Sequence, residues 1–184
     1  MTDKPWLEQY PPNVPAEISL NDHTTLVDVL DGAFRQHAQH DIAACMGTRL
    51  RFGDIDRLSL DLGAWLQCLG LARGARVALM MPNLPQYMVA IAAVLRGGYV
   101  VVNVNPLYTA RELEHQLVDS GAEAIVILEN FASTLEDVIG RTSVRHVVVA
   151  AMGDLLGFWK GRLITFAVRH VRKLVPEFRL PCND

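Results

Sequence analysis

The sequence predicts an α/β fold in which strand–helix units alternate and form a mostly parallel sheet covered by helices. Apolar runs of strand length occupy 76–81, 99–104, 124–128 and 146–151. The first two runs do not alternate with polar residues, as expected of strands whose two faces are both covered. Helix-length segments separate the runs, and this spacing implies parallel strands joined by crossover helices.

Helical patterns fill the rest of the predicted domain. Thr25 and Asp28 form a variant capping box before a helix that extends to His37. A short strand is expected at 42–46, followed by a turn and a second amphipathic helix over 53–70. Pro85 opens a third helix that is apolar nearly all round, which predicts that it packs between layers.

The domain division follows from composition. Residues 1–23 are proline-rich and read as an extended arm that Trp6 and Tyr10 could attach to the body. Residues 24–152 form the α/β subdomain. Residues 153–184 form a basic amphipathic segment and a linker that reads as truncated.

Charge and cysteine usage exclude some classes of protein. The 184 residues contain 17 basic and 20 acidic side chains, a net charge of −3, and this argues against a nucleic-acid partner. The three cysteines fit no metal spacing and are expected to be reduced thiols of a cytoplasmic protein. The first 15 residues lack the apolar core of a signal peptide.

No catalytic, cofactor-binding or metal-binding constellation is visible. The glycine fingerprint of dinucleotide enzymes and the G-x-S-x-G hydrolase motif are absent, and 153–161 resembles a phosphate loop without its Gly-Lys-Ser/Thr. His37 and His40 lack a third ligand. The acidic residues Asp54, Asp56 and Asp61 are expected on a solvated helix face.

The segment 96–113 is the most informative part of the chain. It reads as a tight Gly-Gly turn, a fully buried strand, an Asn-Pro-x-Tyr-Thr break and a capped helix. This run closely resembles a signature of the AMP-forming acyl-CoA synthetases. We interpret the signature residues as scaffold rather than catalytic residues. The signature residues are Gly97, Gly98, Asn105, Pro106, Tyr108, Thr109 and Glu112.

The resemblance extends over residues 20–150, including the segments 52–58 and 77–83, and is greatest to the bacterial long-chain fatty-acid–CoA ligases. It implies an enzyme that uses ATP, Mg²⁺ and coenzyme A to convert a long-chain fatty acid to acyl-AMP and then to acyl-CoA. The residues that carry this chemistry are expected beyond Asp184. The chain alone is therefore expected to be an inactive scaffold. At most, it would form part of the wall of the tunnel that holds the acyl chain.

The tail suggests a second hypothesis of a different class, a non-catalytic membrane-docking or binding module that retains part of the ligase fold. On a helix, Arg162, Thr165 and Arg169 fall on one side, and Leu163 and Val168 on the other. Such a helix suits a peripheral position on the inner face of the membrane. The alternative is packing against the rest of a larger protein. The residues expected at the membrane are Phe158, Trp159, Lys160, Arg162, Arg169, Arg172 and Lys173.

A homo-oligomer is a further expectation. The apolar helix between Tyr87 and Leu95 needs neighbours on every side, and an isolated fragment could lack them. An uncovered apolar patch favours self-association.

Overall fold

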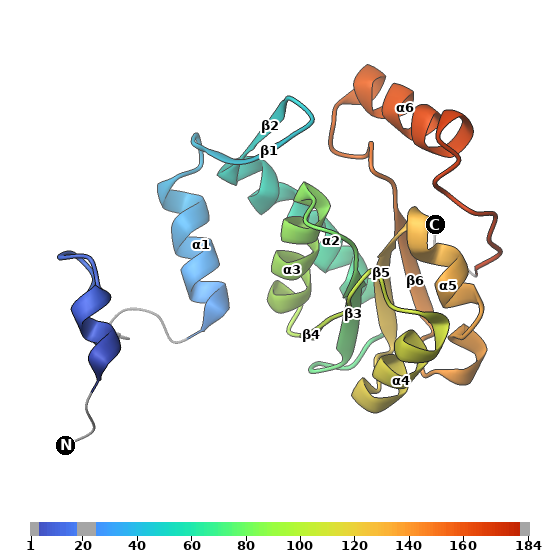
Figure 1. The fold of residues 1–184 in the computed structure, drawn as a ribbon, viewed down its shortest axis with the longest axis horizontal. Coiled ribbons are helices and arrows are strands. Elements are labelled where there is room, and N and C mark those ends of the chain that lie inside the picture. The colour runs from blue at the N-terminus through green and yellow to red at the C-terminus, as the bar shows by residue number, and fades with distance from the viewer. Residues whose placement is uncertain (1–3, 18–24, 181–184) are drawn as a thin grey trace.

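The computed structural model describes residues 4–17 and 25–180, and Figure 1 shows the arrangement of its elements. A short 3₁₀ helix (Pro5–Gln9) lies in the N-terminal arm. The α-helices and strands are α1 (Leu26–Gln36), β1 (Asp41–Cys45), β2 (Thr48–Arg51), α2 (Phe52–Cys68), β3 (Arg76–Met80), α3 (Pro85–Arg96), β4 (Val100–Asn103), α4 (Ala110–Ser120), β5 (Ala124–Leu128), α5 (Ala132–Glu136), β6 (His146–Ala150) and α6 (Phe158–Phe166), which a π-helical turn (Ala167–Val171) continues.

The predicted parallel sheet is confirmed. Four parallel strands lie in the order β4-β3-β5-β6, and Val77 of β3 pairs with Val101 on one side and Ala124 on the other. Val77 and Leu79 face a core shared with α2 and α3, whereas Ala78 and Met80 face a core shared with α4 and α5. Helices therefore cover both faces, which explains the apolar character of β3.

The prediction that the strand near 99–104 is fully buried is wrong. Val100 is 47% exposed, and Val101 and Val102 are only half-buried. The physical reason is the position of β4, which forms the edge of the described sheet and has a strand neighbour on one side only. An apolar run indicates a strand but does not reveal its place in the sheet.

The short strand predicted over 42–46 is present as β1, and it pairs with an antiparallel partner, β2, that the sequence did not reveal. The two strands are joined at Met46 and Gly47, which both adopt positive φ angles. The sequence of β2 is Thr-Arg-Leu-Arg. Its two arginines and short length give no apolar run that would mark a strand.

The third helix lies between layers, as predicted. Seven of the twelve residues of α3 are buried, including Ala93 and Val94, and the buried Leu66 of α2 belongs to the same core. The argument that α3 lacks cover and drives self-association is therefore wrong, because α2 and the sheet cover it. A homo-oligomer remains a prediction with no support from this helix.

The N-terminal arm is described over 4–17, and its remaining residues, like 181–184, lie outside the described residues. It lies to one side of the body in Figure 1. Trp6 is 54% exposed and Tyr10 41% exposed, so the expectation that they attach the arm to the body is wrong. The division at residues 23 and 152 stays a prediction.

Candidate functional site

The glycine pair of the signature segment has a packing explanation. Gly97 ends α3, and the ring of Tyr99 lies so close that a Cβ atom added to Gly97 would stand 2.6 Å from it. Gly98 adopts a φ of +79°, in the region that favours glycine. The turn therefore requires small residues at both positions in order to return the chain into β4.

The Asn-Pro break and the capped helix are held by local hydrogen bonds. The Asn105 Oδ1 atom accepts from the Leu107 N–H at 3.0 Å, and the Asn105 carbonyl accepts from the Tyr108 N–H at 3.1 Å. The predicted capping box is confirmed, since Thr109 and Glu112 each accept a hydrogen bond from the other's backbone N–H. These bonds to the Glu112 carboxylate lower its pKa.

A cleft of about 490 Å³ lies where β3 and β4 end, next to this turn. Ligands of open α/β sheets bind at the carboxyl ends of strands, so its lining matters for function. Asn83, Tyr87, Asn103, Asn105 and Tyr108 contribute its polar groups, and the Tyr87 hydroxyl donates to Asn103 Oδ1 at 2.6 Å. This lining offers amide and phenol hydrogen bonds but no charged group.

The residues at this edge do not fit ATP with Mg²⁺. A nucleotide triphosphate needs cationic or N–H donors, and Mg²⁺ needs free carboxylates. Glu129 follows β5, but it is 1% exposed and its carboxylate is already paired with Arg169 at 2.6 Å. Within the described residues, no three His, Cys, Asp or Glu side chains gather as metal ligands.

A charged network that sequence reasoning missed joins the first three helices. The Arg96 guanidinium, at the end of α3, donates to Asp31 of α1 and to Asp56 and Ser59 of α2. It also lies 4.8 Å from the centre of the Phe34 ring. The expectation that Asp56 lies on a solvated face is therefore wrong. The one available signal was an arginine that closes an otherwise apolar helix.

The tail helix packs differently from the prediction. Gly161 faces the body, because its backbone meets that of Gly153 so closely that an added Cβ would lie 2.3 Å from the Gly153 oxygen. Val168, two helical turns further on, is also buried. This contact determines which side of the helix faces inward. Trp159 and Leu163 consequently point outward and are 81% and 68% exposed.

Two of the seven predicted membrane-contact residues instead bind the body. The Lys160 ammonium donates to the Met46 carbonyl, and Arg169 pairs with the buried Glu129. Arg162 lies 5.0 Å from the centre of the Phe158 ring. The other members, Trp159, Arg172 and Lys173, are exposed. A membrane role for these residues stays a proposal.

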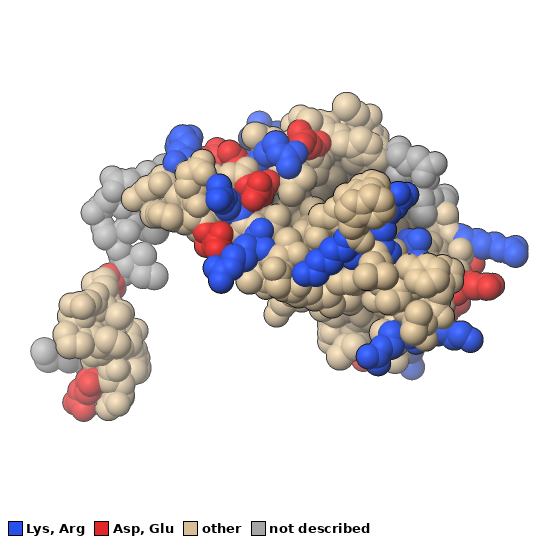
Figure 2. Space-filling model, turned by 90° about the horizontal axis from the view of Figure 1, so that it is seen from above, with Lys and Arg blue, Asp and Glu red and all other residues tan. Residues whose placement is uncertain are grey.

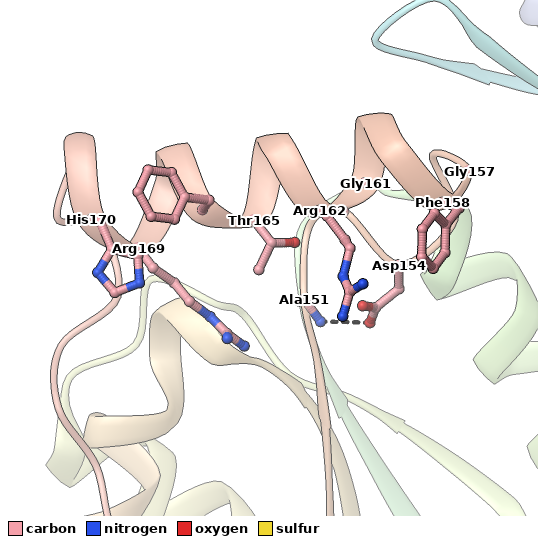
Figure 3. Close-up of a pocket in the computed structure, with 11 residues that line it drawn as sticks. Ala151, Asp154, Gly157, Phe158, Gly161, Arg162, Thr165, Arg169 and His170 are labelled. Carbon is pink, nitrogen blue, oxygen red and sulfur yellow. Dashed lines mark hydrogen bonds between the residues drawn. The ribbon is translucent and has the colours of Figure 1, made fainter.

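The polar side of α6 forms one wall of a cavity of about 700 Å³, shown in Figure 3. The turn that follows β6 forms the opposite wall and carries Asp154, whose carboxylate accepts from the Ala151 N–H at 2.7 Å. Burial raises the pKa of this carboxyl above its ordinary value. Sequence reasoning did not find this cavity, because its two walls are brought together by tertiary contacts such as the close approach of Gly153 and Gly161.

The surface seen in Figure 2 carries lysine and arginine side chains that are separated by uncharged and acidic residues. Among the residues that the structure describes, no helix combines the length and apolar character needed to cross a bilayer.

Comparison with solved structures places the fold among the acyl-CoA and related ligases. The anthranilate CoA ligase AuaEII has a TM-score of 0.67 over 71% of this chain and 26% of its own, at 21% identity. A long-chain-fatty-acid-CoA ligase from Archaeoglobus fulgidus has a TM-score of 0.62 over 76% of this chain and 29% of its own, at 23% identity. At these identities the likeness shows the fold alone.

The sequence establishes the family. A family profile described as AMP-binding enzyme matches residues 30–163. This chain is 50% identical over 180 residues to the long-chain-fatty-acid–CoA ligase of Yersinia pestis, and 36% identical over 182 residues to that of Bacillus subtilis. The chain belongs to the AMP-binding enzyme family. It spans 32% of the length of each of these two relatives, and they cover 97% and 99% of it.

Proposed function

We propose that this chain is the scaffold portion of a long-chain fatty-acid–CoA ligase. The observation that carries the proposal is the 50% identity to such a ligase along 97% of the chain. The signature turn between α3 and α4 supports it, because each of its glycine, asparagine and threonine residues has a structural contact there.

The proposed reaction has two steps. The fatty-acid carboxylate attacks the α-phosphorus of ATP, which forms acyl-AMP and releases pyrophosphate. The thiolate of coenzyme A then attacks the acyl carbon and releases AMP. Mg²⁺ and cationic donors would stabilise the phosphate charge. The cleft after β3 and β4 is lined by no charged residue, which supports the proposal that other parts of the ligase supply the Mg²⁺ ligands and the cationic donors.

A chimeric enzyme tests the scaffold role. The 184 residues replace the matched third of the Yersinia pestis ligase, and oleoyl-CoA formation is measured. We expect a folded chimera with substantial activity, since half of the exchanged residues are identical. A chimera that melts cooperatively like the parent but makes no oleoyl-CoA would contradict the proposal.

The isolated chain provides a second test. We expect no fatty-acid-dependent exchange of labelled pyrophosphate into ATP by the purified chain, with the intact Yersinia pestis ligase as the positive control. Exchange by the chain itself would show that adenylation chemistry resides in these residues.

A second candidate function is contact with a membrane surface. The specific observation is the outward stripe formed by Trp159 and Leu163 on one side of α6. The exposed cations Arg172 and Lys173 follow the stripe. Apolar burial together with attraction to anionic lipid is the usual basis of peripheral binding.

Vesicle sedimentation tests this second function. The chain should bind vesicles that contain phosphatidylglycerol, and added salt should weaken the binding. Trp159→Ala should reduce it severalfold, whereas Trp6→Ala, which removes an exposed tryptophan of the arm, serves as the control. Equal losses in both variants, or no binding at low salt, would remove the membrane hypothesis.

A further inference from the structure

The cavity beneath α6 combines charged and aromatic walls in one open space. Figure 3 shows Arg162, Thr165 and Arg169 extending from the helix toward the turn that carries Asp154. The rings of Phe158 and Phe166 also line the cavity, and both side chains are more than half exposed. A ligand in this space would meet polar groups near the turn and apolar surface along the helix.

The cations of this cavity are not equivalent. Arg169 is neutralised, since its guanidinium pairs with the buried Glu129 carboxylate through two nitrogen atoms at 2.7 and 2.6 Å. Arg162 has no carboxylate within ion-pair distance among the described residues, and its guanidinium lies over the face of the Phe158 ring, 5.0 Å from the ring centre. Arg162 is therefore the cation that is available to an incoming anion.

We infer that the cavity binds the carboxylate head group of a free fatty acid, with Arg162 as the pairing cation. A guanidinium presents parallel N–H donors that match a carboxylate. The aromatic rings beside it would cover the first methylene groups of the acyl chain. This inference rests on the proposed fatty-acid substrate, and it adds a holding site on the tail helix.

The charge of the cavity favours a head group with a single negative charge. The Asp154 carboxylate lies on the wall opposite Arg162, and Arg169 offers no net charge after pairing with Glu129. A dianion such as a phosphate monoester would meet one free cation and one opposing anion. Asp154 therefore repels a phosphate group and disfavours its binding, whereas a fatty-acid carboxylate can lie on the helix side of the cavity.

Equilibrium binding of dodecanoate below its micellar concentration tests the site, using the purified 184-residue chain and isothermal titration calorimetry at neutral pH. Arg162→Gln should weaken binding about tenfold, the loss expected for one charge-assisted pair. Arg111→Gln removes an exposed cation from α4 and should leave the affinity unchanged. Dodecanol, which lacks the carboxylate, should bind both variants and the parent chain with equal, weaker affinity.

Three outcomes would overturn the site: no dodecanoate binding, equal losses in the two variants, or Arg162-dependent binding of phosphatidylglycerol vesicles without binding of dodecanoate. The last result would assign the cavity to a phospholipid head group. The assay requires neither ATP nor coenzyme A, so the holding site can fail while the chimeric ligase is active. If the chimera fails and binding persists, the ligase proposal fails and the site stands as a carboxylate site.

Discussion

Helices α3 and α6 are both rich in apolar residues, yet the fold uses them in opposite ways. α3 lies between α2 and the sheet, and its Ala93 and Val94 are completely buried. α6 lies over the carboxyl end of the sheet in Figure 1 and presents Trp159 and Leu163 to the outside. Composition thus shows that a helix has an apolar side, but tertiary contacts decide whether that side is covered.

The contacts that fix the two helices also differ. α3 is held by a continuous apolar core. α6 and the turn that continues it are held by a glycine–glycine approach, the hydrogen bond from Lys160 to the Met46 carbonyl, the buried Val168 and the pair between Arg169 and Glu129. A helix that is fixed by a few contacts can keep its apolar side exposed, and in this protein that is the side proposed to meet lipid.

The largest difference in stability between the two regions is expected from a pair of leucine substitutions. Leu66→Ala removes a buried side chain from the core beneath α3 and should reduce the free energy of unfolding by about 2–5 kcal/mol. Leu163→Ala removes an exposed side chain from α6 and should change it by less than about 0.5 kcal/mol. Urea denaturation measures both, and similar losses would show that the outward side of α6 is covered.

The ion pair beneath α6 should be the next largest contribution. Arg169→Gln leaves the buried Glu129 carboxylate without its cation, which costs about 3 kcal/mol or releases the helix locally. The double variant with Glu129→Gln should recover most of the loss, because a neutral amide costs less to bury than an unpaired charge. Thermal unfolding and amide exchange along 158–171 would detect either result. If Arg169→Gln alone were as stable as the parent chain, the ion pair with Glu129 would make no such contribution to stability.

The capping box of α4 should contribute less. Thr109→Ala removes the hydroxyl that accepts the Glu112 N–H, and it should lower the free energy of unfolding by about 1 kcal/mol. Thr25→Ala at the similar box of α1 is the matched comparison. A loss at Thr25 alone would mean that the signature turn, rather than the cap, fixes the start of α4.

Asp154 is expected to make the smallest contribution to the free energy of unfolding, and the pH dependence of unfolding shows the sign of this contribution. Burial raises the pKa of this carboxyl from 3.8, so the folded chain holds the proton more tightly than the unfolded chain. The associated stability is present below pH 3.8 and is lost as the pH rises through the folded pKa. Asp154→Asn keeps an oxygen acceptor for the Ala151 N–H and does not titrate. Its unfolding free energy should therefore fall less than that of the parent just above pH 4, and identical profiles would contradict the assignment.

The sequence was sufficient for features that depend on local patterns. The parallel sheet, the layered position of α3 and the Thr109–Glu112 cap all follow from periodicity, turn residues and capping chemistry. It was insufficient where distant contacts decide the outcome. The edge position of β4, the network around Arg96 and the inward side of α6 depend on partners that are distant in the sequence, and Arg96 and Asp31, for example, are 65 residues apart. No local pattern encodes such contacts.

The most direct test of the account is cysteine accessibility on opposite sides of α6. Leu163→Cys and Val168→Cys are compared by the rate of alkylation with iodoacetamide, quantified on the labelled peptide by mass spectrometry. The structure predicts rapid labelling at position 163, which is 68% exposed in the parent, and strong protection at position 168, which is 7% exposed. Protection at 163 with rapid labelling at 168 would contradict the orientation on which the membrane and head-group proposals both depend.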